Sequence, residues 1–168
     1  ASESAEVGKL LGTKMAVNNF ANIAEMKEAV GTAMGPSEWV TIDQDRINKF
    51  AEATGDHQWI HVDVERATKE LPTKGTIAHG FLTFSLLPMM NYELYQLESA
   101  VHGINYGSNK LRFLNMVPSG SRVRGPLTLK SVEMHKSGGY QVIAEVSVEI
   151  EGHDKPALIA ETIAVLYE

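Results

Sequence analysis

The chain has 168 residues, of which 43% are hydrophobic and 21% are charged, values typical of an ordinary globular protein of one domain. Its formal net charge of −6 lacks the basic excess with which proteins bind nucleic-acid phosphates, so nucleic acid is not an expected partner. The absence of cysteine excludes disulfides, thiolate metal sites and a cysteine nucleophile, and fits a reducing cytoplasm. We expect neither a signal peptide nor a membrane-spanning helix, because the most apolar stretch, from Ile77 to Met90, is short and contains His79 and Pro88.

The N-terminal part is predicted to lie outside the main domain. Residues 1–16 are interpreted as a loose leader, and apolar residues at close to helical spacing over 17–34 predict a helix that packs outside the main fold. Gly35-Pro36 ends this helix. The prediction therefore divides the chain into a leader and helix at 1–35 and a folded domain at 36–168, which opens with a short strand near Val40.

A second helix is predicted between Asp43 and Gly55, because an aspartate is a favoured N-cap and a glycine commonly ends a helix. A short helix is expected over 64–70, followed by a loop. The longest apolar run, 81–97, predicts one long helix that is buried on most sides and bent at Pro88, which lacks a backbone N–H.

The second half of the chain changes to the period of a strand. Four strands are predicted, over residues 104–117, 122–134, 140–151 and 157–167. They are separated by turns rich in glycine, serine and proline. The expected fold class is therefore α+β, with an antiparallel sheet wrapped around the long helix.

Reactive side chains are most concentrated between Thr54 and Asp63, directly after a predicted helix end, and loops held by rigid elements often carry catalytic groups. Asp56 and His61 suit a reaction that adds water to an alkene beside a thioester, because a carboxylate and an imidazole can share the proton transfers. Gly80 suits the oxyanion position, because a helix start offers free N–H groups to developing negative charge. The less specific interpretations are a turn residue for Asp56, a structural histidine for His61 and tight packing for Gly80. A metal pair of His57 and His61 would need this segment to be helical.

Two segments resemble a known family. The string from Phe50 to Asp56, continued to His61 and Ala67, resembles the hydratase motif of MaoC-like dehydratases and (R)-specific enoyl-CoA hydratases. The string Gly75 to Gly80 resembles the segment by which that family enters its central helix. The likeness extends from about residue 37 to the C-terminus and is greatest to the nodulation protein N-like branch.

The resemblance implies a hot-dog fold, a homodimer in which two sheets join, and hydration of trans-2-enoyl-CoA to (R)-3-hydroxyacyl-CoA without a metal or another cofactor. It assigns the catalytic roles to Asp56 and His61 and the oxyanion glycine to Gly80. The family's Asn-Pro is replaced here by Gln58-Trp59, which puts the substrate range in question. We therefore expect Gln58 and Trp59, together with His79, to contact the substrate.

Several alternatives stay open at this stage. The same fold could serve an acyl-CoA thioesterase or a non-catalytic dimer that binds acyl thioesters. For His79 a structural role at the helix start competes with a role in the site, and Trp59 could be a pocket wall or part of the core. Three methionines could line an acyl tunnel, although core filling is favoured: Met89, Met90 and Met116. Candidates for contacts to the CoA phosphates are Arg112, Arg122, Arg124 and Lys130.

Overall fold

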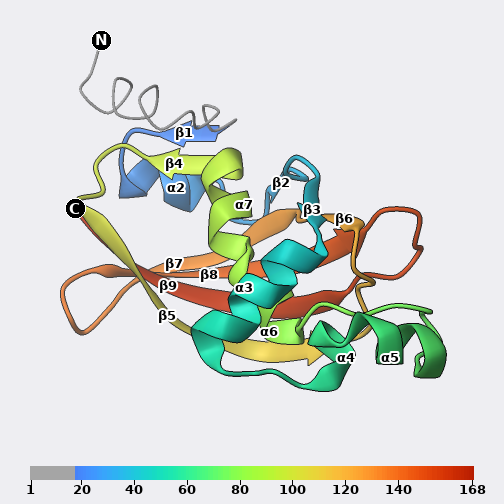
Figure 1. Cartoon of the computed structure of the whole chain (residues 1–168). Coiled ribbons are helices and arrows are strands. Elements are labelled where there is room, and N and C mark those ends of the chain that lie inside the picture. Colours follow the sequence, from blue (N-terminus) through green and yellow to red (C-terminus); the bar gives the residue numbers. More distant parts are fainter. Residues whose placement is uncertain (1–17) are drawn as a thin grey trace, which may run out of the picture.

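The computed structural model describes residues 18–168, so the predicted leader at 1–16 lies outside the described part. The chain forms a curved antiparallel sheet whose concave face is occupied by helices (Figure 1). The central strand, β8 (Tyr140–Ile150), pairs with β9 (Leu158–Tyr167) on one side and with β7 (Leu127–Met134) and the end of β6 (Ser121–Arg124) on the other. β9 also pairs with β5 (His102–Phe113), which forms one edge. The short strands β2 (Ala33–Met34) and β3 (Val40–Ile42) pair with β7 and β6.

The core lies between the inner face of this sheet and the helices. Alternate residues of β8, from Val142 to Ile150, are buried, as the alternation of the sequence predicts. They pack in one cluster with buried residues of the helices, among them Ile47, Leu87 and Met90. The α+β architecture predicted from the sequence is therefore confirmed.

The helix α3 (Gln44–Thr54) carries its start and stop signals where the sequence predicts them. The carboxylate of Asp43 accepts a hydrogen bond from the backbone N–H of Arg46 at 2.9 Å. Gly55 ends the helix in the left-handed conformation, with φ 79°, which glycine adopts without a steric cost. Asp56 directly follows this helix end.

The prediction of one continuous helix over 81–97 is wrong. The run is divided into α6 (Gly80–Ser85) and α7 (Leu87–Leu94), and its last residues form the strand β4 (Tyr95–Leu97). Pro88 lies in the first turn of α7, where its missing N–H costs no hydrogen bond, whereas within one continuous helix it would break one. Leu82, Leu87 and Met90 are buried, whereas Phe81 and Tyr92 are exposed. None of the helices in the described residues is long and apolar enough to cross a membrane.

The segment before residue 35 does not form the separate helix that the sequence predicts. It contains β1 (Asn18–Phe20), the short helix α2 (Ile23–Glu28) and β2, and β1 pairs in parallel with β4 (Figure 1). Ile23, Met26 and Met34 are buried within the same cluster as the sheet. The expectation that this segment packs outside the fold is therefore wrong, because its apolar face covers the sheet. A domain boundary at residue 35 stays a prediction.

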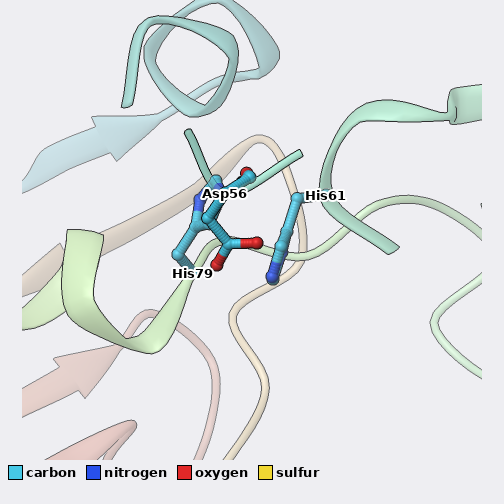
Figure 2. A group of neighbouring side chains, drawn as sticks. All are labelled: Asp56, His61 and His79. Atoms are coloured by element: carbon cyan, nitrogen blue, oxygen red, sulfur yellow. The ribbon is translucent and has the colours of Figure 1, made fainter. Parts of the chain in front are cut away.

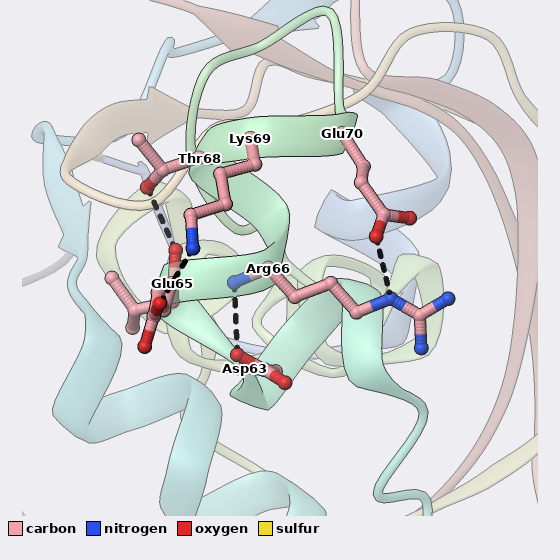
Figure 3. Close-up of polar contacts among 7 residues, drawn as sticks. Asp63, Glu65, Arg66, Thr68, Lys69 and Glu70 are labelled. Atoms are coloured by element: carbon pink, nitrogen blue, oxygen red, sulfur yellow. Dashed lines mark hydrogen bonds and ion pairs between the residues drawn. The ribbon is translucent and has the colours of Figure 1, made fainter.

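Between α3 and α6 lie two short helices, α4 (Trp59–Val62) and α5 (Val64–Glu70), of which α5 was predicted with these bounds. Polar contacts stabilise α5 locally (Figure 3). The carboxylate of Asp63 accepts from the N–H of Arg66 at 2.9 Å, and Lys69 pairs with Glu65 at 2.6 Å across one turn. α4 has only four residues and depends on outside contacts for its position.

Candidate active site

Asp56, His61 and His79 converge although three different segments carry them. One carboxylate oxygen of Asp56 and one ring nitrogen of each histidine lie within 4.8 Å of one another, and Figure 2 shows the carboxylate beside the His61 ring. Asp56 follows the turn at Gly55, and its Oδ1 accepts from the backbone N–H of Gln58 at 3.3 Å. His61 lies on α4 and His79 directly precedes α6. The pairing of Asp56 with His61 that the motif predicts is thus present in space.

The ring of His61 is held in one tautomer. Its Nδ1 lies 2.7 Å from the carbonyl oxygen of Ile77, and because a carbonyl only accepts, Nδ1 carries the proton. Nε2 of the neutral ring is then an acceptor. Burial lowers the pKa of His61 from its ordinary 6.5, an effect that the hydrogen bond to Ile77 and the nearby Asp56 partly oppose. Neutral His61 therefore predominates at pH 7.

His79 is buried and contacts both Asp56 and His61. It is 2% exposed, its Nε2–H donates to the backbone carbonyl of Asp56 at 3.0 Å, and its ring stacks on His61 with centroids 3.9 Å apart. Phe50 of α3 covers another side, at 4.8 Å between centroids. Within the described residues, Nδ1 of His79 has no hydrogen-bond partner. His79 thus contacts the backbone of Asp56 and the ring of His61 together.

An apolar cavity of about 330 Å³ opens beside His61. Gly80 forms part of its wall as the first residue of α6, where its N–H has no acceptor within the helix. The ring of Phe113, at the end of β5, lies against Gly80, since a Cβ added there would be 3.0 Å from two of its carbons. The remaining lining residues are Ile77, Ala78, Thr83, Leu114, Asn115, Met116, Val117, Ala157 and Leu158.

The comparison with known proteins decides the family. Residues 25–151 match the family described as MaoC like domain. This chain belongs to the MaoC-like family. It is 48% identical over 147 residues to the 3-hydroxyacyl-thioester dehydratase Z of Mycobacterium tuberculosis, covering 88% of this chain and 97% of that protein. It is 44% identical over 146 residues to nodulation protein N of Rhizobium leguminosarum bv. viciae, covering 86% and 91%.

The fold agrees with this membership. The (R)-hydratase from A. caviae superposes with a TM-score of 0.66 and 19% sequence identity, covering 82% of this chain and 96% of that protein. The predicted hot-dog fold and the predicted likeness to the nodulation protein N branch are confirmed. The family is one of thioester dehydratases and hydratases, so the assignment to lyases follows at this level.

Three residues expected to contact the substrate lie elsewhere in this MaoC-like site. Gln58 is exposed, and its backbone N–H holds the carboxylate of Asp56. Trp59 is half-buried, with the guanidinium of Arg66 over its ring at 4.0 Å from the centroid. His79 is buried behind His61. None of the three lines the cavity, so their contact with substrate stays a prediction that the cavity does not support.

The cluster that contains His61 does not include His57, the other member of the alternative metal pair. His57 is exposed and does not belong to the cluster, in which His79 takes the third place. The rings of His61 and His79 are only 26° from parallel, so their nitrogen lone pairs lie in nearly parallel planes and do not point at a common centre. The geometry fits acid–base chemistry better than metal ligation.

The other candidates of the sequence lie apart from the cavity, with one exception. Arg122, Arg124 and Lys130 pair with Glu151, Glu149 and Glu161 on the outer face of the sheet. Nη1 of Arg112 donates to the neighbouring carbonyl of Leu111. Met90 is fully buried, as core filling predicts, and Met89 does not line the cavity. Met116 does line it, so core filling is wrong for that residue.

Proposed function

We propose that this chain adds water to trans-2-enoyl-CoA and forms (R)-3-hydroxyacyl-CoA, with Asp56 and His61 as the catalytic pair. One observation carries the proposal: the imidazole of His61 lines an apolar cavity, and the carboxylate of Asp56, which is exposed and does not itself line the cavity, lies within 4.8 Å of a His61 ring nitrogen. The apolar lining suits an acyl chain, and a polar pair at its edge suits the reacting end of that chain.

A carboxylate oxygen of Asp56 and Nε2 of His61 can each accept a hydrogen bond. A water molecule that donates to two acceptors at about 2.8 Å each spans roughly 4.5 Å between them. A carboxylate oxygen of Asp56 and a ring nitrogen of His61 lie within 4.8 Å of each other, close enough for one such water to reach both groups. A water held in this way turns its oxygen lone pair away from the protein, toward the substrate.

In the proposed reaction the water oxygen bonds to C3 of the enoyl thioester while its proton passes to one member of the pair. A proton from the pair then reaches C2. One O–H bond of the water and the π bond between C2 and C3 are broken, and one C–O bond and one C–H bond are formed. Negative charge builds on the thioester oxygen in between. The N–H of Gly80 is our candidate donor to that oxygen, because Gly80 lines the cavity and its N–H has no helical acceptor. No cofactor takes part.

The proposal includes a homodimer, and the edge that supports it is β5. β9 pairs on both sides, whereas within residues 18–168 β5 pairs with β9 alone. Ile104, Tyr106 and Phe113 on β5 are exposed, as are Leu114 and Met116 in the cavity wall. A long edge with exposed apolar residues favours pairing with a second copy. Light scattering should give twice the chain mass of 18.4 kDa, and a mass near 18.4 kDa at micromolar concentration contradicts the dimer.

Crotonyl-CoA tests the reaction and separates it from the two alternatives. Loss of the enoyl absorbance without free thiol indicates hydration, release of thiol indicates a thioesterase, and binding without either indicates a non-catalytic protein. The product should resist an (S)-specific 3-hydroxyacyl-CoA dehydrogenase, and its oxidation by that enzyme would overturn the stereochemistry. His57→Ala is the matched control, because this exposed neighbour lies outside the cluster and its loss should leave the rate unchanged.

A further inference from the structure

The side chain of Gln44, at the first position of α3, connects the two segments that hold the His61 ring. Its Nε2 donates to the backbone carbonyl of His61 at 2.8 Å, and its Oε1 accepts from the hydroxyl of Thr76. The orientation of the amide follows from these partners. A flipped amide would place Oε1 against the carbonyl oxygen of His61, two acceptors in contact. A second Nε2 proton is directed at Oδ1 of Asn48, at 2.9 Å on the exposed side of α3.

Both ends of this link lie where the imidazole is oriented. Thr76 is 2% exposed and directly precedes Ile77, whose carbonyl accepts from Nδ1 of His61 at 2.7 Å. The N–H of Ile77 in turn donates to the carbonyl of Ile60 at 3.1 Å. The ring of His61 is therefore held from the segment 76–77, while Gln44 holds the backbone of His61 to that same segment.

We propose that Gln44 and Thr76 form a positioning clamp, which holds the imidazole of His61 at the position from which it shares a water with Asp56. This inference rests on the hydratase function proposed above. Because α4 has four residues and cannot hold its own geometry, the clamp replaces the rigidity that a longer helix would provide. A shift of His61 by a fraction of an ångström would remove Nε2 from the position at which it shares a water with Asp56. Groups that are misplaced in this way lower turnover more than binding.

Gln44→Met tests the clamp, because methionine has a similar length and neither donates nor accepts as an amide does. We expect kcat for crotonyl-CoA to fall about 10- to 100-fold with KM changed less than about 3-fold. Thr76→Val should likewise lower kcat while changing KM little. Thr76→Ser, which keeps the hydroxyl, should retain the wild-type kcat. Gln44→Met combined with Thr76→Val should be no worse than either alone, because one link is broken in each case. Full kcat in Gln44→Met, or multiplied losses in the double variant, would overturn the clamp.

Two further variants separate positioning from stability. Asn48→Ala removes only the exposed partner of Gln44, so it is the matched control and should keep wild-type kcat. Gln44→Glu keeps an acceptor for Thr76 but turns an oxygen toward the carbonyl of His61, so it should lose as much activity as Gln44→Met. Thermal unfolding identifies any variant that fails to fold at the assay temperature. Equal losses of kcat in Asn48→Ala and Gln44→Met would assign Gln44 a merely structural role.

A readout without turnover distinguishes failure of the clamp from failure of the proposed function. ¹⁵N spectra of the imidazoles report which nitrogen of His61 carries the proton. The wild-type chain should show the Nδ1–H tautomer, and Gln44→Met should show a mixture, with the pKa of His61 lowered because its hydrogen bond to Ile77 is loosened. An unchanged tautomer and an unchanged pKa in Gln44→Met would refute the clamp even if the wild-type chain did not hydrate crotonyl-CoA.

Discussion

Replacing Gly80 by alanine and by proline separates the two properties for which a glycine is proposed at this position. Alanine adds a Cβ and keeps the N–H, whereas proline adds a Cβ and removes the N–H. The backbone tolerates proline here, because Gly80 is the first residue of α6 and the preceding His79 has φ −59° and ψ 138°, a conformation that proline favours in the residue before it. Gly80→Ala is thus the matched control for Gly80→Pro.

The structure indicates how much the Cβ alone should cost. It would lie 3.0 Å from Cγ and Cδ1 of Phe113, against an ordinary carbon contact of about 3.5–4 Å, so the ring must move by roughly half an ångström. Phe113 is 44% exposed and has room to move. Overpacking costs about 1 kcal/mol at its lower end, and the entropy gained on replacing glycine offsets roughly 0.5–1 kcal/mol. The free energy of unfolding should therefore change by less than about 1 kcal/mol.

Turnover should separate the two variants. We expect kcat for crotonyl-CoA to fall less than about 10-fold in Gly80→Ala, and a further 10²- to 10³-fold or so in Gly80→Pro, the usual loss for one oxyanion donor. Phe113→Leu removes the ring that the Cβ meets, so in that background Gly80→Ala should recover and Gly80→Pro should not. Equal kcat values for the alanine and proline variants would refute the assignment of the oxyanion donor to this N–H.

Three other predictions follow from the charges of the site and of the sheet. Because the pKa of His61 is lowered from 6.5, the unfolded chain binds this proton more readily than the folded one, so stability should fall as the pH drops below about 6.5. Thermal unfolding from pH 7.5 to 5.5 checks this, and an identical slope in His61→Gln would contradict it. Glu161 accepts from Lys110 and Lys130, which lower its pKa to about 2, so its contribution to stability is complete above its ordinary 4.5 and is lost as the pH falls toward 2. Glu161→Gln should accordingly lower the unfolding temperature at pH 7 but not near pH 2. At pH 7 the decrease should be larger than in the control Glu145→Gln, which removes a carboxylate 3.6 Å from Lys130. Activity should survive exhaustive chelation, and a loss that one divalent ion restores would show that a metal takes part.

Local signals in the sequence predicted the elements that depend on neighbouring residues. The cap at Asp43 and the stop at Gly55 define α3, and the alternation of β8 identifies its buried face. The short motif from Asp56 to His61 predicted a pair that the fold brings together, with Asp56 directly after the end of α3 and His61 on α4. Such patterns extend over at most a dozen residues and determine the structure locally.

Long-range features could not be predicted in this way. Phe113 and Leu158 meet at the cavity because β5 pairs with β9, a pairing between segments that no local pattern connects. The break between α6 and α7 arises because Pro88 starts a new helix more easily than it bends an old one. The N-terminal apolar residues have helical spacing, but only the open face of the sheet determines that Ile23 and Met26 pack onto it. Tertiary contacts decide each of these outcomes.

The measurement that tests the account most directly is the turnover of crotonyl-CoA by the wild-type chain, Asp56→Asn and His61→Gln, with thermal unfolding of each. Both substitutions keep the approximate shape of the side chain and remove its acid–base function. We expect that the wild-type chain hydrates crotonyl-CoA and that each variant folds but loses at least about 10²-fold in kcat. Near-normal turnover in either folded variant would show that the residue takes no part in the mechanism. It would contradict the claim that Asp56 and His61 act together on one water.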